Sequence, residues 1–417
     1  MPAIVGDLHG LGLYGWVFTT LLMANVVGVA LGGELCDRIG ARAGILSGVI
    51  SLVAGLVIAG LATGMPLFLL GRGAQGFGGG LVIVSLYVLA ATVYDEELRP
   101  RLFAVEAAAW VAPAMVGPFL AGLAVDHISW RALFLTIALL VAGSAVLLWP
   151  ASRHATHQQI SIKALRQLRR WVLAVPAALG LAAIQLAGQH LRWTTIILAP
   201  IGIAMLAATL PRLLPRGVFS AHAGISVIVL CRGLINGAYN GIVAFLPLML
   251  VTIHGYTATA AGLPLTLGTL GWAAASWLQS RTWSSTNTTR LRVGFAMLSL
   301  AGLLLAGVAT DLLAGFCTYP IWIIGGAGVG TVFPTLAVLL LKHSPPARRG
   351  TDSAGFSMAE TMAAAITVGI GGSLVAAAQQ HLMPLTHGLA IPMTLMAVIA
   401  AAGIIIASRA DPQLPGP

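Results

Sequence analysis

Two glutamates and one arginine stand inside long apolar stretches of the chain, where ionised side chains are unusual. Glu106 and Glu360 are the acidic residues that lie clearly within such stretches, and Arg72 lies about six residues inside another, roughly 9 Å deep in a helix. A carboxylate withdrawn from water binds a proton more readily, because desolvation disfavours its charged form. We therefore predict that Glu106 and Glu360 are proton-coupling residues. The alternative is that both pair with arginines at a gate and that Arg72 only extends toward the interface.

A fourth apolar stretch carries a polar stripe that begins at Arg232. Asn236, Tyr239 and Asn240 follow it by four, seven and eight residues, which places them on one face of a helix. We predict that this stripe and Gln75 line a substrate cavity. The alternative is that these polar groups only hold neighbouring helices together.

Prolines and glycines are spaced for a bend in the stretch that contains Glu106. Pro113 and Pro118 remove backbone donors and favour a kink, while Gly117 and Gly122 allow a neighbouring helix to approach closely. We predict a hinge or sealing surface here. A purely structural kink is the alternative.

The elements that must position these residues are membrane-spanning helices. The 417 residues are 58% hydrophobic and only 8% charged, and thirteen apolar stretches of about 20 residues can be marked along them. This composition excludes a water-soluble enzyme, a nucleic-acid-binding module and a disordered chain. We expect an all-α polytopic membrane protein with no separate soluble domain, no cofactor and no metal site, since its three cysteines form no paired pattern.

The basic residues predict an orientation in the membrane. Eighteen of the 22 lysines and arginines fall in alternate loops, and only Arg131 and Arg192 fall in the opposite ones. By the positive-inside rule the former loops and the C-terminus are cytoplasmic. The first stretch then runs from outside to inside, so we expect one further span before Pro2, fourteen in total.

The chain divides into two similar parts around a basic connector. Glu106 precedes Gly117 by eleven residues, as Glu360 precedes Gly371, and the preceding stretches carry the glycine-rich runs of residues 73–80 and 325–330. Such repetition is typical of secondary transporters. We predict an N-terminal half at residues 1–149, a cytoplasmic connector with two accessory helices at 150–223, and a C-terminal six-helix half at 224–417.

Four ordered motifs carry a family resemblance: GELCDRIGAR (33–42), LLGRGAQGFGGG (69–80), AMVGPFLAG (114–122) and WRALF (130–134). The chain resembles the fourteen-span drug:proton antiporter family of the major facilitator superfamily. The resemblance implies two six-helix halves plus two extra central helices, with thirteen spans present and the family's first helix, which usually carries an acidic motif, absent before Pro2. It also implies a role for Arg72 in proton movement and associates the segment around Gly117 with antiporters. The second half lacks an acidic residue in its counterpart of the gate loop.

For the first cytoplasmic loop, the resemblance implies a gate formed by Gly33, Asp37, Arg38, Gly40 and Arg42. Asp37 is expected to face the start of the eleventh family helix, here residues 351–353, where a helix N-terminus stabilises a carboxylate. The alternative is that these charges only orient the loop.

The resulting functional prediction is a proton-coupled secondary exporter, an antiporter, of small hydrophobic or amphipathic compounds by alternating access. The alternatives are a proton-coupled importer, a dedicated metabolite exporter, and a transport-inactive membrane protein used for sensing or assembly. No nucleotide-binding loop, HExxH or GxSxG motif indicates an enzyme. We expect a monomer in the plasma membrane of a bacterium, whose partners are a small-molecule substrate, protons and the lipid bilayer, and no nucleic acid.

Overall fold

The computed structural model describes residues 1–93, 99–152, 168–189, 193–214, 217–218, 224–282, 286–345 and 349–410. Every regular element in these ranges is a helix. After the short α1 (Pro2–Asp7) and a single 3-10 turn, the long helices are α2 (Tyr14–Ile39), α3 (Ala41–Gly60), α4 (Met65–Val93), α5 (Arg99–His127), α6 (Trp130–Ser152), α7 (Leu168–Gln189), α8 (Trp193–Leu213), α9 (Ile225–Thr252), α10 (Ala258–Thr282), α11 (Asn287–Ala309), α12 (Thr318–His343), α13 (Arg349–Gln379) and α14 (Leu385–Ile406).

The thirteen long helices, α2 to α14, correspond in order to the thirteen predicted apolar stretches. Nine of the described helices are long and apolar enough by composition to cross a bilayer, and α7 and α8 contain shorter apolar segments. Helices satisfy their own backbone hydrogen bonds, as the hydrocarbon interior requires. The predicted all-α polytopic membrane fold is confirmed.

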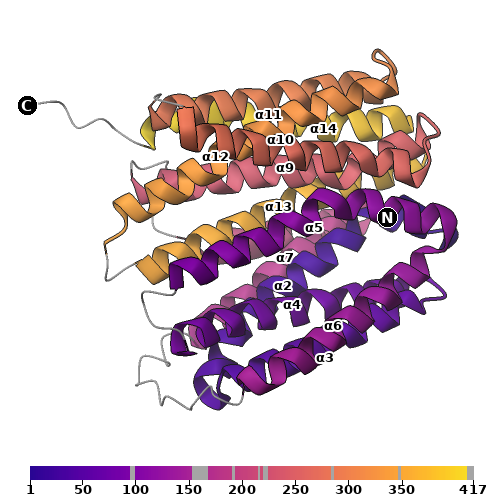
Figure 1. Cartoon of the computed structure of the whole chain (residues 1–417). Coiled ribbons are helices and arrows are strands. Elements are labelled where there is room, and N and C mark those ends of the chain that lie inside the picture. Colours follow the sequence, from indigo (N-terminus) through magenta and orange to yellow (C-terminus); the bar gives the residue numbers. More distant parts are fainter. Residues whose placement is uncertain are drawn as a thin grey trace, which may run out of the picture.

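The long helices run side by side, so that α14 ends at the opposite end of the bundle from α1 (Figure 1). Helices α2, α3, α4 and α6 form one side of the view, and α9 to α12 with α14 form the other. Helix α13 lies between the two groups and packs on both α2 and α9, and α5 also lies between them and packs on α6 and α10. The bundle therefore has two groups of helices, and some of the candidate site residues lie on the helices that join them.

Small residues allow the helices within each group to approach closely. A methyl group on Gly55 of α3 would lie 2.6 Å from the carbonyl oxygen of Gly71 on α4, and one on Gly294 of α11 would lie 2.5 Å from that of Gly328 on α12. Lipid tails are as apolar as leucine, so close packing of this kind, rather than hydrophobic burial, joins helices in a membrane.

Helix α7, which the sequence predicts to be an accessory helix, contacts α2 and α13. Thr19 of α2 donates a hydrogen bond from Oγ1 to Oε1 of Gln185 on α7 at 2.5 Å. A methyl group on Gly188 of α7 would lie 2.3 Å from Oγ of Ser373 on α13. Beside α7, α2 and α13 themselves come together at Gly15 and Gly372, where a methyl group on Gly15 would lie 2.5 Å from the facing Cα. The accessory helix thus supports the junction between the groups.

Candidate functional site

The structure brings together two of the residues singled out in the sequence, Arg232 of α9 and Glu360 of α13. Arg232 donates hydrogen bonds from Nε and Nη2 to Oε2 of Glu360, at 2.9 and 2.7 Å. The Arg232 side chain is 13% exposed and that of Glu360 is 29% exposed. Both residues stand within spans, where an ionised group normally needs a partner. Each therefore neutralises the other, and the pair joins two helices that are 128 residues apart in the chain.

Aromatic rings cover the other side of the Arg232 guanidinium. Its Cζ lies 3.6 Å from the centroid of the Phe333 ring and 4.8 Å from that of the Phe356 ring. Tyr239 belongs to the same aromatic group: it stacks on Trp322 with centroids 5.5 Å apart and meets Trp272 edge-on at 5.7 Å. Rings of α12 and α13 thus contact the guanidinium, and rings of α9, α10 and α12 form an aromatic group behind Phe333.

The predicted polar stripe on α9 continues from the ion pair. Asn236 donates from Nδ2 to the backbone oxygen of Glu360 at 2.9 Å, and Asn240 donates to the backbone and side-chain oxygens of Asn236, both at 3.0 Å. The bond from Asn236 ties α9 to α13 one turn beyond Arg232, and the bonds from Asn240 lie within α9. In this conformation the stripe helps to pair the two helices. Its predicted role in lining a substrate cavity stays a prediction.

Arg72 and Gln75 form a second network, in α4 at the half of the bundle nearer α1. Arg72 donates from Nε to the backbone oxygen of Val17 at 2.9 Å and from Nη1 to Oε1 of Gln75 at 2.8 Å. Gln75 donates in turn to the backbone oxygen of Gly55 at 3.0 Å. Both acceptors of Arg72 are neutral, in contrast to the carboxylate that holds Arg232. The network connects α4 to α2 and α3.

The predicted gate segment is mostly helical. Helix α2 continues to Ile39, and the chain breaks only at Gly40, whose φ of 97° suits glycine best, before α3 starts at Ala41. Within the last turn, Arg38 forms an ion pair with Glu34. The side chain of Asp37 lies outside the described side chains, so its predicted contact with the start of α13 stays a prediction. That helix start carries its own buried carboxylate, Asp352, which accepts a 2.7 Å hydrogen bond from Ser344 Oγ.

The predicted hinge residues lie in α5, and two of them pack on α10. A methyl group on Gly122 would lie 2.5 Å from the Cα of Thr259, and one on Gly262 would lie 2.5 Å from the carbonyl oxygen of Pro118. Pro113 is exposed, and no atom lies within 4 Å of the position that a methyl group on Gly117 would take. The segment therefore forms a close crossing between the two groups of helices.

A carboxylate at the end of the same helix completes this crossing. Oδ2 of Asp126 accepts hydrogen bonds from the backbone nitrogen and Oγ1 of Thr259 at 2.8 and 2.6 Å, and Oδ1 accepts from the nitrogen of Ala258 at 3.1 Å. Partial burial opposes ionisation of Asp126, but the hydrogen bonds from Thr259 and Ala258 outweigh it and hold its pKa below the ordinary value. Asp126 of α5 therefore caps the first turn of α10.

The WRALF segment belongs to a separate cluster at the same end. Oδ2 of Asp7 accepts hydrogen bonds from Nη1 of Arg131 at 2.8 Å and from Nε1 of Trp130 at 3.1 Å. These bonds lower the pKa of Asp7, the bond from Arg131 most. The cluster ties α1 to the start of α6.

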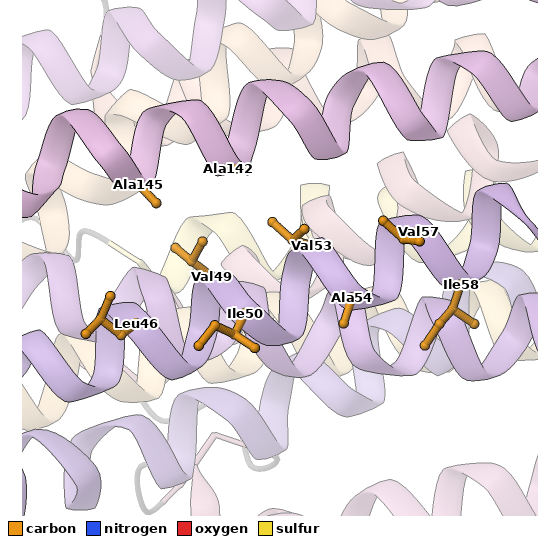
Figure 2. A pocket seen from close by; sticks show the side chains of 9 residues that line it. All are labelled: Leu46, Val49, Ile50, Val53, Ala54, Val57, Ile58, Ala142 and Ala145. Carbon is orange, nitrogen blue, oxygen red and sulfur yellow. The ribbon is translucent and has the colours of Figure 1, made fainter.

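The remaining predicted coupling residue, Glu106, belongs to α5, but its side chain lies outside the described side chains. Among the described residues no three His, Cys, Asp or Glu side chains are grouped as metal ligands. A groove of about 580 Å³ lies between α3 and α6. All nine side chains that line it are apolar, so it differs in chemistry from the polar networks described above. Figure 2 shows Val49 and Val53 of α3 pointing toward α6 and Ala145 of α6 pointing toward α3, a surface suited to lipid tails.

Comparison with known proteins decides the family. A family model described as the Major Facilitator Superfamily matches residues 1–368. The chain belongs to the major facilitator superfamily. Among relatives of this chain, an uncharacterized MFS-type transporter of Mycobacterium tuberculosis (strain ATCC 25618 / H37Rv) is 28% identical over 403 residues, covering 90% of this chain and 56% of the relative. The chain thus spans little more than half the length of that relative.

A second relative and a solved structure are also similar to this chain. A probable multidrug-efflux transporter of the same Mycobacterium tuberculosis strain is 26% identical over 441 residues, covering 100% of this chain and 91% of the relative. A solved structure of a POT family transporter in complex with 5-aminolevulinic acid superimposes with a TM-score of 0.67 at 14% identity, covering 97% of this chain and 95% of that one. The second similarity shows the shared transporter fold.

Three residues of this member of the superfamily were not predicted from the sequence. Phe333 and Phe356 contact Arg232, and Asp126 caps α10. Phe356 precedes Glu360 by one helical turn, so the spacing could have predicted that the two residues share a face of α13. Phe333 comes from another helix, and no local pattern pointed to it. Asp126 was not singled out, although its position after a proline- and glycine-rich segment was a usable signal.

Proposed function

We propose that this chain is a proton-coupled secondary exporter of small hydrophobic or amphipathic compounds, working as an antiporter by alternating access. The observation that supports it best is the ion pair of Arg232 and Glu360, which joins α9 to α13 inside the bundle. The names of relatives, which include a probable multidrug-efflux transporter and a multidrug resistance protein of Bacillus subtilis (strain 168), favour export of drug-like compounds. The segment of α5 that resembles an antiporter motif agrees with this direction.

The ion pair offers a direct coupling device. Oε2 of Glu360 accepts both guanidinium bonds, and the partial exposure of the side chain allows its other oxygen to exchange a proton with water. Protonation removes the negative charge and weakens the attraction between α9 and α13. A transported proton then changes the strength of one junction in the bundle, which is what alternating access requires.

Other parts of the chain have supporting roles in this proposal. Glu106 is a second coupling carboxylate, and Arg72 maintains the contact of α4 with α2 during the cycle. The gate segment of residues 33 to 42 closes the cytoplasmic side, while the end that carries Asp126 faces outside. The protein works as a monomer in a bacterial plasma membrane with its C-terminus in the cytoplasm.

The test is Glu360→Gln in proteoliposomes, with ethidium as the amphipathic probe and an imposed pH gradient. Glutamine keeps the shape and one acceptor oxygen but cannot release a proton. We expect uphill export to be lost while downhill movement of ethidium survives. Glu97→Gln, a glutamate that the sequence places between apolar stretches, is the matched control and should keep gradient-driven export.

The same assay separates the competing explanations. Full uphill export by Glu360→Gln together with its loss in Glu106→Gln would move the proton site to α5. Retention of uphill export by both variants would contradict a coupling role for either carboxylate. Gradient-driven uptake in place of export would indicate an importer on the same fold.

A further inference from the structure

The guanidinium of Arg232 has two kinds of partner that respond differently to protonation. Glu360 holds it through charge, at 2.7 and 2.9 Å. Phe333 of α12 and Phe356 of α13 hold it through their ring faces, at 3.6 and 4.8 Å from Cζ. The attraction of a cation for a ring face does not depend on the charge of a neighbouring carboxyl group. The rings therefore keep their attraction for Arg232 when Glu360 becomes neutral.

The ring closest to the guanidinium is itself held in place. Phe333 meets Trp272 edge-on with centroids 4.8 Å apart, and Trp272 meets Tyr239 in the same way at 5.7 Å. Tyr239 stacks on Trp322, which is fully buried. Edge-on and stacked rings restrict one another's orientation. A row of aromatic contacts from α9, α10 and α12 thus fixes the face that Phe333 presents to Arg232.

We propose that Phe333 and Phe356 form an aromatic clamp, a pair of positioning residues that keeps the Arg232 guanidinium beside Glu360 after Glu360 has bound a proton. The clamp rests on the proposed function, in which Glu360 alternates between charged and neutral forms. A buried guanidinium without a counter-charge is unfavourable and would otherwise turn toward water. Held by the rings, it stays close to the carboxyl group and favours release of the proton.

Arg232 is the ionisable side chain in contact with Glu360 within the described part of the chain. The helices packed against α13 are α2, α7, α9, α12 and α14. Their other ionisable residues, with the two others on α13 itself, are Tyr14, Glu34, Cys36, Asp37, Arg38, Arg169, Arg170, Cys231, Tyr239, Tyr319, Lys342, His343, Arg349, Asp352 and His387. The charge of Arg232 is therefore the one whose position the clamp controls.

The test variant is Phe333→Leu, which removes the ring face and keeps a large apolar side chain. Without the ring, Arg232 moves away when Glu360 is neutral, and Glu360 then binds its proton more tightly. We expect the protonated form of Glu360 to persist to higher pH in Phe333→Leu than in the wild type, because the opposite charge has moved away from the carboxyl group. Phe333→Tyr keeps the ring and should keep the wild-type midpoint of Glu360 protonation.

The midpoint can be measured without knowing the substrate. Infrared difference spectra of the full chain in liposomes, recorded across a pH titration, show the carbonyl band of a protonated carboxyl group. The band that disappears in Glu360→Gln belongs to Glu360. Phe295→Leu is the matched control, because Phe295 is a fully buried ring of α11 that packs against Gly403. It should leave the midpoint unchanged.

Each outcome supports or overturns the proposed aromatic clamp. A wild-type or lower midpoint in Phe333→Leu overturns it, as does a Glu360 band that does not titrate. If Phe333→Leu does not fold, Phe356→Leu is titrated instead, and a smaller rise is expected because its ring is farther from Cζ. Failure of the proposed function is distinguishable: Glu360→Gln would then keep full gradient-driven ethidium export, whatever the infrared midpoints.

Discussion

At the scale of single residues, two arginines inside spans are stabilised in different ways. Arg232 has a carboxylate and two ring faces, while Arg72 has a backbone carbonyl and the side-chain oxygen of Gln75. A carboxylate partner can be switched off by a proton, whereas neutral acceptors cannot. Under the proposed function, this difference favours the Arg232 pair as the coupling device and Arg72 as a contact between α2 and α4 that a proton does not weaken.

The contribution of the Arg72 network to stability can be tested with Arg72→Lys. A lysine has all of its donors on one nitrogen and cannot replace both the Nε bond to Val17 and the Nη1 bond to Gln75. Loss of one hydrogen bond from a charged group lowers the free energy of unfolding by about 1.5–3 kcal/mol. Thermal unfolding of purified Arg72→Lys should show a lower Tm than that of the wild type. Arg38→Lys, which changes an exposed side chain, should keep the wild-type Tm. Equal Tm values for both variants would contradict the assignment.

At the scale of elements, the crossing of α5 and α10 is the clearest junction between the two groups of helices. Gly122 and Pro118 bring the backbones together, and Asp126 caps the first turn of α10. Because the pKa of Asp126 lies below its ordinary value of 3.8, the carboxylate stays ionised in neutral and mildly acidic solution. Its stabilisation of the junction is present above the ordinary pKa and is lost only as the pH falls through the lowered value.

Removal of this cap should loosen one end of the bundle. Asp126→Ala loses an N-cap worth about 1 kcal/mol, which corresponds to roughly a fivefold change in an equilibrium between closed and open forms. The measurement is the rate at which an impermeant maleimide modifies Ala261→Cys, a buried position of α10, with the three natural cysteines replaced. Asp7→Ala is the control, because Asp7 is bound to Trp130 and Arg131 instead of α10. Equal rates in the two variants would show that Asp126 does not hold the junction.

At the scale of the whole molecule, the distribution of basic residues predicts which end of the bundle lies outside. A cysteine at Ile128, an exposed residue between α5 and α6, should react with an impermeant maleimide in intact cells. A cysteine at Ser408, an exposed residue just after α14, should react only after the cells are permeabilised. The reverse pattern would invert the proposed topology and exchange the assigned roles of the Asp126 junction and the gate segment.

The number, type and order of the helices were determined by the sequence alone. A stretch of about 20 apolar residues has one stable form in a bilayer, a helix that satisfies its own backbone groups, so hydropathy was sufficient to place α2 to α14. The ends of the helices were not determined in this way. The predicted loop at residues 33–42 is helical to Ile39, because polar residues mark the edge of the membrane but Gly40 is what ends the helix.

The partners of the charged residues were decided only by the tertiary structure. Spacing along α9 and α13 placed Arg232 and Glu360 on helical faces but assigned them to different tasks, and nothing in either segment indicated that the two faces meet. The reason is that helical periodicity is local, whereas the angle and rotation at which two helices pack depend on all their neighbours. Phe333 shows this most plainly, since it reaches Arg232 from α12 and its ring is oriented by Trp272 of α10.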